Sequence, residues 1–393
     1  MLNATRLINE NEIIDIANSL LRKALSIRAS DIHCEPYHDE YRIRMRIDGV
    51  LQLITILPIE QAKAITTRLK IMAKLNIAEQ RLPQDGQLAI DGQTMRVSTL
   101  PVIMGEKIVL RVMDNAEHVL SIADLGLNDI EQKNYKDCLN APQGLILVTG
   151  PTGSGKTVTL YSGINQINGA ERNICSVEDP IEMPIKGVNQ TQINPKSGLG
   201  FAQTLRAFLR QDPDVMMIGE IRDHETAEIA VQAAQTGHLV LSTLHTNSSA
   251  EALIRLNQMG IKNYLIASSL KLIIAQRLVR KLCNHCKKPA VHPFIVEDSD
   301  QPKTIQHFVA QGCEHCVGGY FGRTGIYELL VITPDIQALL LKQNEFSFEQ
   351  IAQFMRQKQI KTLPQSAIDK VIAGETSLDE VQRVITFPFN NQA

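Results

Sequence analysis

One short segment limits the possible folds of this chain more than any other. Residues 150–157 read Gly-Pro-Thr-Gly-Ser-Gly-Lys-Thr, a glycine followed by four residues and then Gly-Lys-Thr. An apolar run, residues 145–149, precedes the segment, and a helical pattern follows it. A glycine-rich turn between a buried strand and a helix predicts a parallel sheet covered by helices, with a phosphate-binding loop (P-loop) at its edge.

The residue types in this loop suit the binding of ATP and Mg²⁺. Glycines let the backbone wrap around phosphates, and the N-terminus of the following helix offers free N–H groups. Lys156 is expected to reach the β and γ phosphates, and the Thr157 hydroxyl is expected to coordinate Mg²⁺. The alternative is a chance glycine-rich turn, which the flanking strand and helix disfavour. The predicted nucleotide-binding residues are Gly150, Pro151, Thr152, Gly153, Ser154, Gly155, Lys156 and Thr157.

The segment after residue 140 alternates between strand and helix patterns, which is typical of an α/β domain with a parallel sheet. We therefore expect a RecA-like core. A long helix is predicted between the strand that ends at residue 177 and the strand that begins at residue 215. The predicted core strands are residues 145–149, 174–177, 215–218 and 239–243.

An acidic residue follows one of these strands at the position of a Walker B motif. Residues 215–218 are apolar and lead to Gly219 and Glu220. Because Gly219 stands where a second acid is usual, Glu220 is expected to serve the Mg²⁺ shell, the attacking water, or both. The alternative is a solvated loop residue, which is less favoured after a P-loop strand.

Two further groups of polar residues flank the predicted core strands. Glu178 and Glu182 follow one strand, and acids at that edge can polarise a water beside the γ-phosphate. His238 and His245 flank another strand, and a polar side chain at its end can sense the γ-phosphate. A lone histidine is more often structural, and His238 is held as a catalytic candidate less firmly than His245.

Four of the seven cysteines form two Cys-x-x-Cys pairs. Such pairs predict a closed tetrahedral Zn²⁺ site, structural rather than catalytic because no coordination position stays open. Redox chemistry is the minor alternative, and the 26-residue run 287–312 between the pairs is longer than usual in zinc ribbons. The predicted zinc ligands are Cys283, Cys286, Cys313 and Cys316.

The first 118 residues show a different pattern, that of an α+β domain. Apolar residues at helical spacing over residues 13–24 predict a helix with one apolar face. Residues 41–47 alternate apolar residues with arginine, and Asp48-Gly49 turns the chain into residues 50–56. This pattern predicts a β-hairpin with an arginine face, and further strands are expected at residues 95–99 and 108–112.

Composition narrows the range of functions. Apolar residues make up 44% and charged residues 21%, which is the balance of a soluble globular protein. The net charge of −2 and the few aromatic residues disfavour a nucleic-acid-binding protein, so no nucleic acid is expected as a partner. The most apolar later stretch, residues 264–279, is interrupted by Lys271, Gln276 and Arg277, so a cytoplasmic protein is expected.

Taken together, these motifs resemble the secretion ATPases that power type II secretion and type IV pilus assembly. The resemblance covers nearly the whole chain and includes a glycine in Walker B, which is typical of that family. Pilus retraction motors look similar but usually lack the four cysteines, which favours the assembly or export type. The matching segments are residues 29–33, 44–49, 81–86, 150–157, 178–182, 219–220 and 237–246, the cysteine pairs, and residues 322–328.

The resemblance implies a homo-hexameric ring that hydrolyses ATP and drives an inner-membrane platform protein, with the motor peripheral to that membrane. Each ATP would lie between the RecA-like core and an N-terminal PAS-like domain that bears arginines. Arg81, Arg96 and Arg111 are the candidates for phosphate contact from that domain. The core between residues 150 and 246 shows no obvious arginine finger of its own, with Arg206 and Arg210 as possible exceptions.

The resemblance leaves some points open. Family members commonly carry a further N-terminal domain that docks on an inner-membrane partner, whereas this sequence starts at the arginine-bearing domain, which leaves that partner open. The rival function is a DNA-translocating or nucleic-acid-binding ATPase of a conjugation or competence system. The predicted domains are residues 1–118, α+β; 119–275, the RecA-like ATPase core; 276–330, the zinc subdomain; and 331–393, a helical subdomain.

Overall fold

The computed structural model of the chain describes residues 10–113, 119–298, 301–342 and 346–386. It divides into two compact units, residues 1–117 and 118–393, which are described separately. The α/β fold predicted from the sequence is confirmed. The division into four domains stays a prediction, and one strand, Leu270–Leu282, runs across the boundary expected after residue 275.

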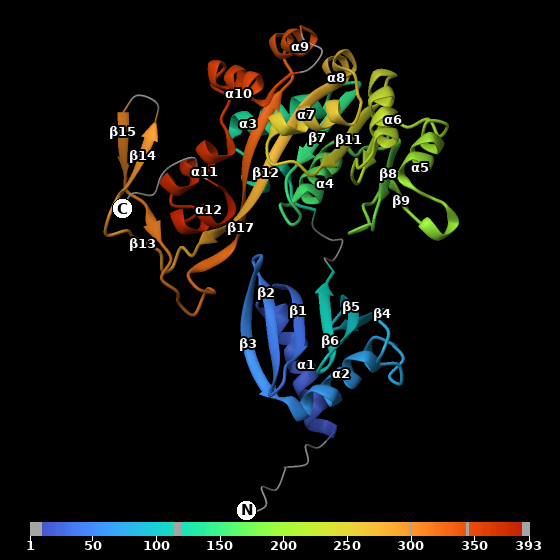
Figure 1. Cartoon of the computed structure of the whole chain (residues 1–393), viewed down its shortest axis with the longest axis vertical. Helices are drawn as coiled ribbons and strands as arrows, with labels where there is room; N and C mark the ends of the chain where they lie inside the picture. The colour runs from blue at the N-terminus through green and yellow to red at the C-terminus, as the bar shows by residue number, and fades with distance from the viewer. Residues whose placement is uncertain (1–9, 114–118, 299–300, 343–345, 387–393) are drawn as a thin grey trace, which may run out of the picture. The chain divides into compact units, whose positions relative to one another are not determined.

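The first unit is a six-stranded antiparallel sheet with two helices, and its strands run in the order β3-β2-β1-β6-β5-β4 (Figure 1). The helix and the hairpin predicted for this region are both present. Its elements are α1 Glu10–Ser26, β1 Ala29–Pro36, β2 Glu40–Ile47, β3 Val50–Pro58, α2 Ile59–Met72, β4 Gln84–Ile90, β5 Gln93–Val102 and β6 Gly105–Val112.

Strand β2 shows why this sheet has one covered face. Its residues alternate between buried apolar side chains such as Ile43 and Met45 and partly exposed arginines such as Arg44. Successive side chains of a strand point to opposite faces, so the apolar set packs beneath α1 and α2 while the arginines stand on the other face. The turn to β3 uses Asp48 and Gly49, both with positive φ, as a hairpin of this type requires.

A buried ion pair joins helix α2 to strand β6. The Lys70 side chain is 1% exposed, and its Nζ lies 2.8 Å from Oε1 of Glu106, whose side chain is 6% exposed. The same ammonium donates to the Glu79 carbonyl at 2.6 Å. Because both charges are out of water, each is compensated only while the other is present.

The second unit contains a seven-stranded sheet in the order β17-β12-β7-β11-β10-β8-β9, parallel except for β17. Strand β7 lies between β11 and β12 near the centre of the sheet (Figure 1). The sheet strands are β7 Gly144–Thr149, β8 Ile174–Glu178, β9 Val188–Gln192, β10 Val215–Ile218, β11 Leu239–Leu244, β12 Leu270–Leu282 and β17 Tyr320–Val331.

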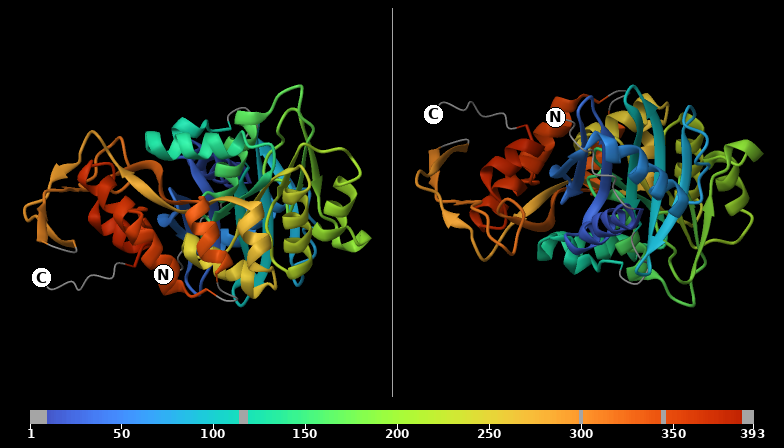
Figure 2. Two further views of the ribbon diagram at one scale, coloured as in Figure 1. Left: turned by 90° about the horizontal axis from the view of Figure 1, so that it is seen from above. Right: turned by 90° about the horizontal axis from the view of Figure 1, so that it is seen from below.

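Helices cover both faces of this sheet, which explains why its central strands are fully buried and largely apolar (Figure 2). Ile146 and Val148 pack toward α3 and α4, whereas Leu145 and Leu147 pack toward α6 and its neighbours. The helices are α3 Asp129–Leu139, α4 Lys156–Ile167, α5 Phe201–Phe208, α6 His224–Gln235, α7 Ser249–Gln258, α8 Asn263–Ser269 and α9 Pro334–Leu341, with η1 Ile122–Leu125 and η2 Pro195–Ser197.

The long helix predicted between residues 177 and 215 is wrong. The segment instead forms the edge strand β9, the short turn η2 and the helix α5 of 8 residues. Pro195 cannot donate a backbone hydrogen bond, and Gly198 adopts a φ of 77°, so the helical hydrogen-bond ladder cannot run through this stretch.

The C-terminal part extends from the two longest strands of the sheet. Strands β12 and β17 pair antiparallel over most of their length and lead into a small cysteine-bearing lobe. Glu328 of β17 is buried and accepts hydrogen bonds from the backbone N–H groups of Ser249 and Leu363, so it anchors the starts of α7 and α11. The remaining elements are β13 Lys288–Pro289, β14 Phe294–Asp298, β15 Gln301–Ile305, β16 Phe308–Val309, α10 Phe348–Gln357, α11 Leu363–Ile372 and α12 Leu378–Val384.

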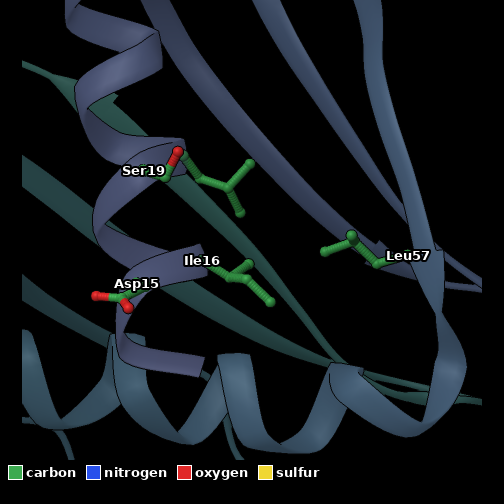
Figure 3. A pocket seen from close by; sticks show the side chains of 5 residues that line it. Asp15, Ile16, Ser19 and Leu57 are labelled. Carbon is green, nitrogen blue, oxygen red and sulfur yellow. The ribbon is translucent and has the colours of Figure 1, made fainter. Parts of the chain in front are cut away.

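Among the described residues, none of the helices combines the length and the apolar character that crossing a bilayer requires. A shallow pocket in the first unit lies between α1 and β3 and is lined by Asp15, Ile16, Ser19, Leu20 and Leu57 (Figure 3). Its lining offers one carboxylate and one hydroxyl. The pocket is therefore not part of the P-loop site, which belongs to the other unit.

The buried ion pair generates a prediction about stability. Replacing Lys70 with Met leaves the Glu106 carboxylate buried without its partner, so the first unit should lose about 3–5 kcal/mol of unfolding free energy. Lys63→Met is the matched control, because Lys63 lies on the same helix with an exposed side chain. Denaturant unfolding followed by circular dichroism measures both variants, and equal stability of the two would contradict the prediction.

Candidate nucleotide and metal sites

The P-loop leaves the sheet at a point fixed by strand pairing on both sides of β7. Thr149, the last residue of β7, is fully buried, and its Oγ1 lies 2.7 Å from Oγ1 of Thr246. The Thr246 backbone N–H also donates to the Thr149 hydroxyl at 2.9 Å. The end of β7 is therefore tied to the segment that follows β11, and the loop begins from a rigid base.

Two glycines of the loop are required by its conformation and by close neighbours. Gly150 has φ 152°, and a Cβ there would lie 2.6 Å from the Gln276 carbonyl oxygen. Gly155 caps α4 with φ 87°, in the left-handed region, and a Cβ there would lie 3.2 Å from Nε2 of Gln276. Larger residues would push the loop off strand β12.

Lys156 begins helix α4 and folds back over the loop. Its Nζ donates to the Gly150 carbonyl at 2.8 Å and to the Pro151 carbonyl at 3.1 Å. Burial lowers the pKa of the Lys156 ammonium, the charge of Arg277 lowers it further, and the carboxylate of Glu220 opposes both effects. The ammonium thus has only carbonyl oxygens as hydrogen-bond partners among the described residues, which leaves it able to bind an anion.

Gln276 supports the P-loop from the neighbouring strand and was not identified as a site residue from the sequence. Its side chain is buried; Nε2 donates to the Ser154 carbonyl at 2.6 Å, and Oε1 accepts from the Thr159 hydroxyl at 2.8 Å. The available signal was a polar residue directly after the apolar run of residues 272–275, because a polar residue at such a position needs buried partners.

Glu220 lies just after β10 and faces the end of β11. One of its carboxylate oxygens forms an ion pair with Arg222, and the other lies 3.4 Å from Nε2 of His245. The Glu220 side chain is 14% exposed. The Thr243 hydroxyl donates to the Gly219 carbonyl at 2.7 Å, which fixes the backbone beside the acid. The structure therefore brings together Glu220 and His245, as expected from the ends of parallel strands.

Glu178 and Glu182 differ sharply in environment. Glu178 is buried and accepts hydrogen bonds from Ser176 at 2.8 Å, from Gln190 at 3.0 Å and from the Tyr161 hydroxyl of α4. Burial and the adjacent carboxylate raise the pKa of Tyr161. Glu178 thus fastens α4 to β8, whereas Glu182 is exposed in the segment after that strand.

His238 lies at the other end of its strand. It immediately precedes β11, beside the start of β7, and its Nδ1 lies 3.0 Å from the Ala233 carbonyl oxygen. The six residues of β11 separate it from the P-loop edge, a span of about 20 Å. The structure therefore does not bring His238 to the edge that carries Lys156 and Glu220.

The candidate arginines are distributed over both units. Arg81, Arg96 and Arg111 belong to the first unit, and their guanidinium nitrogens lie 3.7, 3.6 and 3.0 Å from Glu79, Asp85 and Asp31 respectively. In the second unit, Arg206 pairs with Glu225 at 2.7 Å, and Arg210 donates to the Arg206 carbonyl.

The second unit holds two further cations beside the P-loop edge that the sequence did not single out. Arg222 pairs with Glu220. Arg277 is buried and donates to the carbonyl oxygens of Gln276 at 2.9 Å and Asn247 at 3.2 Å. Both follow sheet strands or lie within them, so the edge carries more positive charge than Lys156 alone.

The four predicted zinc ligands lie together at the end of β12 and in the segment that precedes β17. All four Sγ atoms lie within 4.8 Å of one another, with separations of 3.8 Å for Cys283–Cys313, 3.7 Å for Cys286–Cys316 and 3.6 Å for Cys313–Cys316. Zn–S bonds of about 2.3 Å in a tetrahedron place sulfur atoms about 3.8 Å apart. All seven cysteines are free thiols, so the arrangement fits a metal rather than a disulfide.

Comparisons with known proteins match nearly the whole chain to proteins of secretion and pilus assembly. The family model described as "Type II/IV secretion system protein" matches residues 7–383. The "Protein transport protein HofB homolog" of Escherichia coli K12 is 50% identical over 95% of this chain and 82% of its own length. The "Type IV pilus assembly ATPase PilB" of Acinetobacter baylyi is 47% identical over 96% of this chain and 67% of its own length.

A solved structure of a related motor protein also resembles this chain. The chain is 27% identical, with a TM-score of 0.63, to the protein in "Crystal Structure of the Pilus Retraction Motor PilT and Bound ADP", over 94% of this chain and 97% of that one. The match to the family model spans both units and every motif described above. The chain therefore belongs to the family of type II/IV secretion system proteins.

Proposed function

We propose that the chain is a motor ATPase that hydrolyses ATP to power pilus assembly or protein secretion. The main observation behind this proposal is that the P-loop, Glu220 and His245 lie at the same edge of the sheet. Relatives that are 47% identical are named as a pilus assembly ATPase and as the type II secretion system protein E of Dickeya dadantii, which supports ATP hydrolysis. The structural relative was crystallised with ADP, the product of ATP hydrolysis, which supports an adenine nucleotide at this site.

The residues at this edge fit a magnesium nucleotide. Gly150 and Gly155 leave the space that a Cβ would fill, and within the described ranges the hydrogen bonds of the Lys156 ammonium go to carbonyl oxygens and not to a carboxylate. The eight residues 150–157 would hold the phosphates with their backbone N–H groups and with Lys156. The Thr157 hydroxyl and the Glu220 carboxylate would hold Mg²⁺, which neutralises phosphate charge when bound.

Each polar residue at the edge receives a role in this proposal. Glu220 orients the attacking water, and His245 holds the second oxygen of Glu220 until the γ-phosphate competes for the imidazole. Glu178 acts by fastening α4 beneath the loop, and Glu182 supplies exposed negative charge at the same edge. His238 is left out of the catalytic set because it lies at the opposite edge.

The cysteine cluster is proposed to bind one structural Zn²⁺. Four thiolates with tetrahedral spacing leave no open position for chemistry. The metal would fix the lobe in which β12 ends and from which β17 returns, and the buried backbone N–H of Cys283 already bonds to Gly319 at 2.9 Å. So small a lobe has a limited apolar core, so metal binding would supply much of its stability.

The site is proposed to be completed by a neighbouring chain in a homo-hexameric ring. Arg81, Arg96 and Arg111 stand on a unit other than the one with the P-loop, and arginines supplied in trans can accelerate phosphoryl transfer by about a thousandfold or more. The ring would act in the cytoplasm on an inner-membrane platform protein and would associate with the membrane through such partners. Type II secretion and type IV pilus assembly both fit this motor.

The first prediction for this site concerns the P-loop and the Walker B acid. Lys156→Ala removes the cation at the phosphates and should lower ATPase activity at least about a hundredfold. Glu220→Gln keeps the shape of the side chain but loses its charge, so nucleotide should still bind while turnover falls about a hundredfold or more. Steady-state hydrolysis and fluorescent-nucleotide titration measure the two effects, with His238→Ala as the control that should retain activity. Wild-type turnover by Lys156→Ala would refute the site.

The zinc proposal predicts about one Zn²⁺ per chain. Cys286→Ser should lower the zinc content and make the lobe more sensitive to protease, while Cys138→Ser, outside the cluster, should change neither. Elemental analysis and limited proteolysis provide the measurements. A purified wild-type chain without zinc, or with a disulfide between cluster cysteines, would contradict the proposal.

The ring proposal predicts rescue between two inactive variants. Lys156→Ala keeps an intact arginine unit, and Arg111→Ala keeps an intact P-loop, so mixed rings contain interfaces that combine both. Mixing the two should restore part of the activity, whereas mixing Lys156→Ala with Glu220→Gln should not, because both changes damage the same unit. Full activity of a strictly monomeric wild-type chain would show that the site is completed within one chain.

A further inference from the structure

A row of paired residues crosses the sheet of the first unit, and its four central members are charged. Strand pairing places the members of this row directly opposite one another on successive strands, and all point to the face away from α1 and α2. In order from β3 to β4 the row is Leu51, Arg46, Asp31, Arg111, Arg96 and Gln87. It contains three arginines and a single acid, and neighbouring strands lie about 4.8 Å apart.

The acid of the row is buried, whereas its main partner is exposed. The Asp31 side chain is 9% exposed, and the Arg111 side chain is 66% exposed. The residues of β1 and β6 that face the helices, such as Ile32 and Leu110, form the core beneath. Asp31 is thus a rigid point on the sheet, and Arg111 is a long side chain that reaches from it into solvent.

The contacts of Asp31 are divided between its two oxygens. Oδ1 accepts from Nε of Arg111 at 3.0 Å. Oδ2 accepts from the Ser30 hydroxyl at 2.9 Å and lies 3.6 Å from Nε of Arg46. The bond to Arg111 uses Nε alone, so the two terminal nitrogens of that guanidinium stay available to a further anion.

The pairing of Arg111 with Asp31 offsets an unfavourable interaction between two arginines on neighbouring strands. Arg96 lies directly opposite Arg111 on β5, and like charges at directly opposite positions repel each other. An exposed arginine also samples many rotamers, which dilutes any one orientation. The carboxylate of Asp31 attracts Arg111 from the other side, so it opposes the repulsion and selects one orientation.

We propose that Asp31 is a positioning residue that orients Arg111 toward the nucleotide phosphates. This inference rests on the proposed function, in which Arg111 contacts nucleotide held by another chain. Asp31 itself touches no phosphate. It keeps the guanidinium fork of Arg111 in place between binding events, so less conformational entropy is lost when the phosphate arrives.

Glu35 provides a matched control on the same strand. Its side chain is 6% exposed, and it pairs with Arg44 at 2.7 Å and with Lys107 at 2.8 Å, but not with Arg111. Burial alone would raise the pKa of Glu35, but hydrogen bonds from Arg44 and Lys107 lower it to about 2. Glu35→Gln therefore removes a buried, paired carboxylate from β1 just as Asp31→Asn does.

The experiment compares these variants by steady-state ATPase kinetics. Asp31→Asn should lower kcat by between about tenfold and a hundredfold with little change in KM, because misplacing a catalytic group costs rate. Glu35→Gln should lower kcat less than threefold. Asp31→Asn should cause little further loss in an Arg111→Ala background, and its activity should recover in rings mixed with Lys156→Ala chains, which shows that the variant chain is folded.

Three results would overturn the inference while leaving the motor function intact: wild-type kcat in Asp31→Asn, equal losses in Asp31→Asn and Glu35→Gln, or a full additional loss in the Arg111→Ala background. Equal losses would mean that β1 carboxylates act only through the stability of the sheet. Wild-type activity of Arg111→Ala is a different failure, because it would remove Arg111 from the proposed mechanism itself.

Discussion

The site depends first on the pairing of β7 with a parallel strand on each side. Buried on both faces and hydrogen-bonded along both edges, β7 can end in only one place, and the P-loop must start there. Its neighbours then contribute directly: the Thr246 segment after β11 binds Thr149, and Gln276 of β12 holds the loop. A glycine-rich loop without these supports would have no fixed shape in which to present its N–H groups to phosphates.

Because these strands are parallel, the polar residues that follow different strands lie at one edge of the sheet, and those that precede the strands lie at the opposite edge. Strands β8, β10 and β11 all run toward the edge that carries the P-loop, so the residues that follow them meet there. Glu220 and His245 come into contact in this way although they are 25 positions apart in the sequence. His238 shows the converse, because residues that flank one strand are close in sequence and far apart in space.

The features that could be predicted from the sequence depend on residues that lie close together along the chain. The P-loop and the cysteine pairs depend on short spacings, and the alternation of apolar residues and arginine in β2 specifies a half-covered strand. Gln276 and the Tyr161–Glu178 contact were missed because their partners lie on distant segments that only the sheet order brings together. The long helix predicted between residues 177 and 215 is absent, because Pro195 and Gly198 within that stretch favour turns.

The distribution of positive charge suits a site that two chains share. Near the P-loop, the hydrogen bonds of Lys156 and Arg277 within the described part of the chain go to neutral oxygen atoms. Arg222 pairs with the Glu220 carboxylate at the same edge, so cations beyond these would add repulsion before any phosphate arrives. Several arginines of the first unit instead pair with carboxylates of that unit, such as Arg111 with Asp31 and Arg44 with Glu35. In the proposed ring, these cations are compensated while the site is open, and they meet phosphate only when a neighbouring chain presents it. Assembly and nucleotide binding would then be coupled by charge, because the arginine unit gains a stronger anionic partner only where a loaded P-loop lies beside it.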